Sequence, residues 1–69
     1  MEANELITHP SSQREFQMFR RLGGRIEIYK NKVILFPVVI PSEIAEAFAQ
    51  RIRSLDTENL LEVSVKSEA

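Results

Sequence analysis

The feature that most constrains the fold of this chain is a run of nine residues without a polar side chain, Val33–Pro41. An extended segment of this composition has apolar side chains on both faces, so both faces must be covered. The chain has only 69 residues and no cysteine to form a disulfide or a thiolate metal site. Small domains bury a smaller fraction of their surface and usually depend on a disulfide, a metal or a second subunit. The sequence therefore predicts one small domain that is stabilised by self-association.

The beginning of this run and the residues before it predict a β-hairpin. Apolar and polar residues alternate over residues 26–29, and a turn at Lys30–Asn31 or Asn31–Lys32 then reverses the chain. Both turns give the same two faces. One face carries Ile26, Ile28, Val33 and Leu35. The other carries Glu27, Tyr29, Ile34 and Phe36 and is only half apolar. Val38–Ile40 are expected to continue extended, because a proline favours this conformation in the residue before it.

Two helices are expected around the hairpin. The segment Ser12–Glu15 reads SQRE, a capping-box pattern for the start of the first helix, and Gly23–Gly24 would end it. The apolar stripe of this helix is Phe16, Phe19 and Leu22. A second helix is expected from Pro41, a residue that suits the first helical position. Its stripe, predicted to cover the first face of the hairpin, is Ile44, Phe48, Ile52 and Leu55, bordered by Ala45 and Ala49, whose small side chains would let the helix lie close to the sheet or to a second copy.

The last apolar alternation, at Leu61, Val63 and Val65, favours a third strand. The predicted fold class is therefore α+β, a single small domain of order α-β-β-α-β in which a β-hairpin packs on an amphipathic helix, as a dimer. Residues 11–66 form this domain. Residues 1–10 are expected to be a flexible N-terminus, and residues 67–69 a flexible C-terminus.

The side chains available for catalysis are few. His9 is the single histidine and lies in the expected N-terminal segment, while the acidic residues are scattered over solvent-facing positions. Nucleophilic catalysis needs a hydroxyl or thiol beside an oriented base, and no such pair is recognisable. The sequence therefore predicts no catalytic residue, no metal site and no cofactor, and the protein is not expected to be an enzyme.

The expected location is the cytoplasm, without a membrane partner. The apolar run is far shorter than the roughly 20 residues that span a bilayer. Residues 1–10 contain Glu2 and Glu5 and lack the basic and apolar regions of a secretory signal.

The half-apolar face of the hairpin predicts a contact surface. Only the short first helix would be available to cover this face, so a second chain is the other candidate. The residues predicted to form the dimer or partner interface are Tyr29, Ile34, Phe36, Phe16 and Phe19. The occupant would be a second copy or another protein.

A set of basic residues predicts a different kind of partner. Arg20, Arg21, Arg25, Lys30 and Lys32 fall at the end of the first helix and along the hairpin. Two-stranded ribbons enter the major groove of DNA, where arginine and lysine contact phosphates and guanine edges. The same residues are also consistent with ordinary solvated charge. The net charge of −1 argues against tight non-specific binding to nucleic acid.

The segment "VVIPSEIAEAF", Val38–Phe48, resembles the strand–proline–helix element of the AbrB/MazE swapped-hairpin DNA-binding domains. The resemblance covers only this segment. It implies an interleaved homodimer that acts as a transcriptional regulator or an antitoxin.

The sequence thus predicts a small non-enzymatic interaction or regulatory protein, a homodimer that binds another macromolecule. The alternative is a DNA-binding transcriptional regulator or antitoxin-like protein that uses the basic hairpin Arg25–Lys32.

Overall fold

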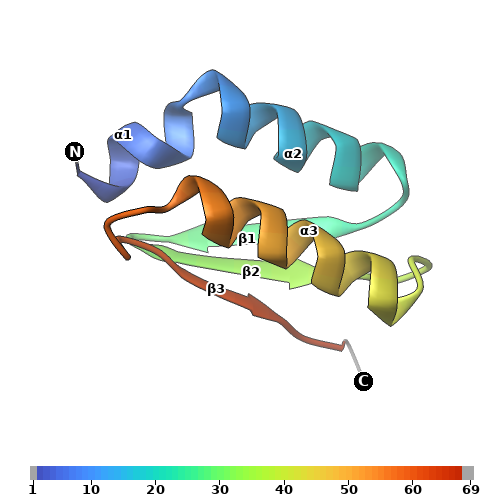
Figure 1. Ribbon diagram of the computed structural model, residues 1–69. Coiled ribbons are helices and arrows are strands. Elements are labelled where there is room, and N and C mark those ends of the chain that lie inside the picture. The colour runs from blue at the N-terminus through green and yellow to red at the C-terminus, as the bar shows by residue number, and fades with distance from the viewer. Residues whose placement is uncertain (1, 68–69) are drawn as a thin grey trace.

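The computed structural model describes residues 2–67, in which three helices pack on one side of a three-stranded sheet (Figure 1). The elements follow the order α1 (Ala3–Thr8), α2 (Pro10–Arg21), β1 (Arg25–Tyr29), β2 (Lys32–Phe36), α3 (Ser42–Leu55) and β3 (Glu62–Val65). The α+β class and the single small domain are confirmed. No helix within residues 2–67 is both long and apolar enough to cross a membrane.

The sheet has the order β1-β2-β3, with β2 in the centre. Strands β1 and β2 form the predicted antiparallel hairpin, whose ends Tyr29 and Lys32 are paired, so the turn is Lys30–Asn31. Lys30 has a φ of 54°, which primed hairpin turns require. Strand β3 lies parallel to β2, and α3 connects them. A parallel pair of strands needs such a crossover, because a short turn cannot bring the chain back to the same end.

The hydrophobic core lies between the sheet and the helices. Val33 and Leu35 of β2 are fully buried and pair with apolar residues on both neighbouring strands. Helix α2 contributes Phe16 and Phe19, and the Phe19 ring meets the Phe48 ring of α3 edge to face, with 5.3 Å between centroids. The other buried side chains of the cluster include Leu6, Ile40, Ala45, Ala49, Ile52 and Leu61.

The buried stripe of α3 differs from the predicted one. Phe48 and Ile52 face the core as expected, but Ala45 and Ala49 complete the stripe, while Ile44 and Leu55 are exposed. Two alanines on the buried side let α3 lie close to the sheet, since interaxial distance depends on side-chain size at the contact. The large residues at the two ends of the predicted stripe therefore project beyond the core.

The N-terminal segment was predicted to be flexible, yet residues 3–8 form helix α1, whose Leu6 enters the core. The predicted capping box at Ser12–Glu15 is also wrong. Helix α2 begins three residues earlier than this pattern predicts, at Pro10, and His9 rather than Ser12 is its N-cap. The His9 Nδ1 atom accepts a hydrogen bond from the Ser11 amide at 3.1 Å. Ser12 is consequently inside the helix and fully buried. A flexible C-terminus was predicted for residues 67–69, and residues 68 and 69 lie outside the residues that the structure describes.

The predicted end of the first helix is confirmed. Gly23 has a φ of 103°, and the amides of Gly23 and Gly24 donate to the carbonyls of Arg20 and Phe19. These two bonds form a Schellman motif, which satisfies carbonyl groups at the helix end. A Cβ atom on Gly24 would lie 2.3 Å from the Phe19 ring. The absence of a side chain there lets the chain pass directly over the core.

The segment between β2 and α3 does not continue extended as predicted. The Ile40 amide donates to the Pro37 carbonyl at 2.9 Å, closing a turn, and Val38 has a φ of 58°. A β-branched residue in this left-handed region is strained, because Cβ approaches the following carbonyl oxygen. The turn directs Ile40 back into the core and leaves Val38 and Val39 outside.

Candidate interaction surfaces

The face of the sheet opposite the helices is not covered by any element of residues 2–67. Strand register places the buried Val33 and Leu35 toward the helices, so the alternate residues Ile34 and Phe36 point to the other side. Tyr29 shares this side and is 60% exposed. We call this surface the uncovered face, formed by Arg25, Glu27, Tyr29, Lys32, Ile34, Phe36, Glu62 and Ser64. Ile34 and Phe36 are half-buried and not enclosed.

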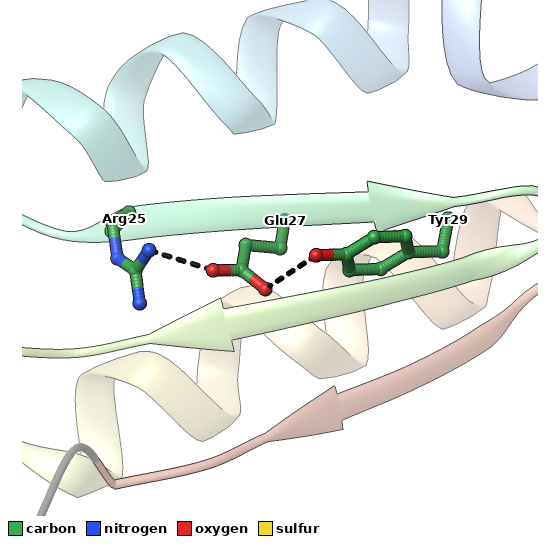
Figure 2. Close-up of polar contacts among 3 residues, drawn as sticks. All are labelled: Arg25, Glu27 and Tyr29. Carbon is green, nitrogen blue, oxygen red and sulfur yellow. Dashed lines mark hydrogen bonds and ion pairs between the residues drawn. The ribbon is translucent and has the colours of Figure 1, made fainter.

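A row of polar contacts runs along β1 on the uncovered face (Figure 2). Arg25 Nη1 donates to Glu27 Oε2 at 2.6 Å, and Tyr29 Oη donates to Glu27 Oε1 at 3.2 Å. The Arg25 guanidinium also stacks on the Phe36 ring of β2, 4.5 Å from its centroid. These contacts hold Tyr29 and Phe36 in defined positions. Ordered side chains lose less conformational entropy when a partner binds.

Phe16 and Phe19 were predicted to belong to the interface, and this prediction is wrong for the folded chain. Both rings are 0% exposed. The prediction assumed that the first helix lies on the opposite side of the sheet from the second helix. Instead α2 and α3 lie side by side on the same face and bury Phe16 and Phe19 between them and the sheet (Figure 1). Neither ring is available to a partner.

The predicted basic residues do not form one surface. Arg20 and Arg21 are exposed in the last turn of α2, and Arg25 begins β1 at the same end of the molecule. Lys30 and Lys32 lie at the other end of that strand, where Lys32 Nζ is 4.0 Å from Glu62 Oε2. Arg25 is already bonded to Glu27 and stacked on Phe36. The structure thus separates the set into two groups, and carboxylates accompany both Arg25 and Lys32.

The side chains with catalytic potential do not converge. His9 uses Nδ1 to cap α2 and lines a hollow of about 140 Å³ together with Ser11, Ser12 and residues 55–58. The Ser12 hydroxyl is buried and has no hydrogen-bond partner. The Asp56 carboxylate at the same hollow accepts the amides of Leu60 and Leu61, both at 2.7 Å, which shapes the loop before β3. The His9 imidazole and the Asp56 carboxylate thus have structural roles.

No group of three or more histidine and acidic side chains in the described part of the chain is arranged to hold a metal ion.

An exposed aliphatic surface at the end of the molecule was missed by the sequence reasoning. Val38 and Val39 are 62% and 74% exposed. Val39 lies against the end of α2, because a Cβ on Gly23 would be 2.6 Å from Val39 Cγ2. Leu22, the residue before this glycine, is exposed as well. The available signal was the pair of prolines, Pro37 and Pro41, which indicates a loop rather than one continuous strand.

Compared with family models, curated proteins and solved structures, the chain has no match. The resemblance of Val38–Phe48 to AbrB/MazE domains therefore stays a prediction. The turn at Val38 differs from the strand that the resemblance implies before the proline.

Proposed function

We propose that this protein is a small non-enzymatic interaction protein of the cytoplasm, which forms a reversible homodimer and binds another macromolecule through the uncovered face. The observation that carries the proposal is that the helices of the described chain pack on one side of the sheet (Figure 1). Ile34, Phe36 and Tyr29 remain on the other side. A three-stranded sheet with one unpacked, half-apolar face is a natural surface for a second protein layer.

The size of the uncovered face determines how strong this association is. Strands of about five residues at roughly 3.3 Å each, spaced about 4.8 Å apart, give a flat area of about 15 Å by 15 Å. A stable interface buries about 800 Å² of accessible surface on each partner. The uncovered face alone is smaller than this. We therefore expect a concentration-dependent dimer with a Kd in the micromolar range or weaker, which leaves the face available to other partners.

The test is the charged variant Ile34→Lys. Glu27 lies directly opposite Ile34 on β1, so the new ammonium group gains a nearby carboxylate and the fold is retained. Dimerisation would remove this ammonium group from water, and the desolvation penalty of several kcal/mol per ion is only partly offset by its attraction to Glu27. Sedimentation equilibrium in about 1 M salt, which screens attraction between charged surfaces, should show dimer for the wild-type protein at high concentration and monomer for Ile34→Lys.

The matched control is Ala47→Lys, which places the same charge at an exposed position on α3. This variant should dimerise like the wild-type protein. Wild-type protein that remains monomeric into the millimolar range would contradict the homodimer. Equal association of Ile34→Lys and wild type would contradict the assignment of the face.

The alternative function, DNA binding through the hairpin Arg25–Lys32, is less favoured because of the positions of its basic residues. A phosphate-binding ribbon needs neighbouring cations that are free to contact the backbone. Here the two basic groups are at opposite ends of β1, and Arg25 is bonded to Glu27. DNA binding that falls steeply with salt and is abolished by Lys30→Glu with Lys32→Glu would restore this alternative.

A further inference from the structure

The two ends of the molecule differ in shape and in charge. The molecule is 33 Å long, and the loops at one end hold the exposed aliphatic residues. We call Leu22, Val38 and Val39 the aliphatic tip. The hollow of about 140 Å³ lies at the opposite end. At that end α1, the end of α3 and the loop before β3 come together (Figure 1). We call this the leucine hollow, lined by Leu6, Leu55, Leu60, Asp56, Thr57 and Glu58, among others.

The aliphatic tip is a fixed protrusion. Pro37 and Pro41 restrict the backbone on both sides of it, and the bond from the Ile40 amide to the Pro37 carbonyl closes the turn. Val38 is held at a φ of 58° although this costs a β-branched residue roughly 1–3 kcal/mol. Such strain persists only where the surrounding structure enforces it. A rigid apolar protrusion loses little conformational entropy on docking.

The charges around the two ends have opposite sign. Exposed Arg20 and Arg21 are next to Leu22 of the tip, and Arg25 and Lys66 lie at the same end of the sheet. Glu27, Glu43 and Glu46 offset part of this charge. The end with the hollow carries Glu2, Glu5, Asp56, Glu58 and Glu62, against Lys30, Lys32 and Arg53 in the last turn of α3. Opposite potentials favour encounter between unlike ends and disfavour contact between two tips.

The hollow fits the tip in size as well as in charge. A cavity of about 150 Å³ lined by aliphatic side chains holds a molecule as large as benzene. A valine side chain is smaller than benzene, so the hollow can receive Val39 or Val38. Leu6, Leu55 and Leu60 form the apolar part of the lining, and the remaining lining residues are polar. Burying a valine side chain completely contributes about 1.5–3 kcal/mol, so contact with the three leucines supplies part of this stabilisation. Every copy of the chain carries both an aliphatic tip and a leucine hollow.

We propose that the aliphatic tip of one copy docks into the leucine hollow of the next copy, in a head-to-tail contact. Such a contact is heterologous, so it leaves one tip and one hollow unoccupied and permits further copies to add. It is independent of the dimer through the uncovered face, because it uses the two ends of the molecule. Together the two contacts would link dimers into longer assemblies.

The experiment measures the average mass of the wild-type protein by sedimentation velocity, as a function of protein concentration and salt. The mass should exceed that of a dimer at high concentration in low salt. It should fall when the ionic strength is raised to about 1 M, where the Debye length shrinks to about 3 Å. In the Ile34→Lys background, the association that remains should come from the head-to-tail contact alone.

Two variants block the two sides of the contact. Val39→Glu puts a carboxylate on the tip, which would face the acidic hollow, and the side chain is exposed enough for the fold to tolerate the change. Thr57→Arg puts a long cation at the exposed edge of the hollow, where it obstructs the space and repels Arg20 and Arg21. Each variant alone should associate at least tenfold more weakly. The control Gln50→Glu adds the same charge as the tip variant in the middle of α3 and should associate normally.

Mixing the two blocked variants gives the decisive result. Val39→Glu retains an intact hollow and Thr57→Arg retains an intact tip, so an equimolar mixture in the Ile34→Lys background should form a 1:1 complex that does not grow. A symmetric contact between identical surfaces would give no such rescue. Circular dichroism and urea unfolding of each variant confirm that the fold is intact.

Three outcomes would overturn the proposal. The first is wild-type protein that never exceeds a dimer at low salt, and the second is failure of the mixed variants to pair. The third is a wild-type tip that binds vesicles of anionic phosphatidylserine in a Val39-dependent manner without self-association, which would assign the tip to a membrane surface. Loss of the dimer in Ile34→Lys does not affect this proposal. Loss of growth in Val39→Glu does not affect the uncovered face.

Discussion

The central strand β2 carries large apolar side chains on both of its faces, but the two faces have different surroundings. On β2, Val33 and Leu35 are completely buried beneath α2 and α3, whereas Ile34 and Phe36, one position along, lie on the uncovered face. Their hydrophobicity is equivalent. The difference arises because both long helices lie on one side of the sheet (Figure 1). An apolar side chain on a strand is therefore more stable when buried, but the position of the helices determines which side chains are buried.

The largest difference between the two faces should appear when an aromatic side chain is removed from each. Phe19→Ala deletes a fully buried ring that packs on Phe48, and we expect it to lower the free energy of unfolding by about 3–5 kcal/mol. That loss is comparable to the whole stability of a small domain. Tyr29→Ala on the uncovered face should lower it by less than about 1 kcal/mol. Urea unfolding measures both, and equal losses would mean that the two faces are equally packed.

A smaller loss is expected where the backbone crosses the covered side. Gly24→Ala would place a Cβ atom 2.3 Å from the Phe19 ring and 2.8 Å from Ile40 Cδ1. Both neighbours belong to the core, so overpacking should lower the free energy of unfolding by about 1–3 kcal/mol. Thermal unfolding would check this value. An unchanged melting temperature would show that Phe19 and Ile40 can shift enough to accommodate the added Cβ atom.

The covered side also contains one group that should weaken the fold. The Ser12 hydroxyl is buried without a hydrogen-bond partner, which costs roughly 1–3 kcal/mol. Ser12→Ala removes this group inside a helix and introduces a better helix former. We expect the free energy of unfolding to rise by about 1 kcal/mol in urea titrations. Ser11→Ala, at a partly exposed position of the same helix, is the control, and destabilisation by Ser12→Ala would indicate that the hydroxyl does form a hydrogen bond.

Strain in the turn that leads away from the uncovered face should be measurable. Val38→Asn keeps a side chain at a φ of 58° but replaces a β-branched residue with one that tolerates this conformation. We expect the free energy of unfolding to rise by about 0.5–1 kcal/mol, an estimate below the full cost of such strain. Val39→Asn is the control for loss of exposed hydrophobicity, and it should leave the stability within about 0.5 kcal/mol.

The smallest effect is expected for the polar row on the uncovered face. Arg25 and Glu27 are exposed enough for water to screen their attraction, and exposed pairs contribute about 0.2–1 kcal/mol. A double-mutant cycle of Arg25→Ala and Glu27→Ala should give a coupling energy in this range. The same variants should change dimerisation more than stability, because they release Tyr29 and Phe36. A coupling energy above 2 kcal/mol would mean that this face is more enclosed than the other contacts suggest.

Much of the local structure was predictable from the residues themselves. Alternation of apolar and polar residues over residues 26–29, together with a two-residue turn, predicted the two faces of the hairpin, because side chains alternate along every strand. The helix end at Gly23 followed from the left-handed conformation that glycine accepts. Tyr29, Ile34 and Phe36 were correctly placed together on one face. Helix α1 was missed because Ala3–Thr8 is short and Leu6 is its single fully buried residue.

The errors concern uncommon local conformations and the packing of distant segments. The start of α2 at Pro10 involves a histidine cap, which is uncommon among N-cap residues. The aliphatic tip depends on a turn at Val38, a residue type that rarely adopts a positive φ. The predicted interface included Phe16 and Phe19 because the side of the sheet on which their helix packs cannot be read from a helical pattern.

By itself, the sequence determined which residues share a face of the hairpin, where the first long helix ends and that the chain must bury an unusually apolar central strand. These properties follow from bonds and steric contacts between residues that are close in the chain. Only the tertiary structure decided that α2 and α3 lie on the same side of the sheet, that Phe16 and Phe19 are buried together, and that Val38 and Val39 are left at the tip. Those outcomes depend on which apolar surfaces from distant parts of the chain pack against one another. A local sequence pattern does not contain this information.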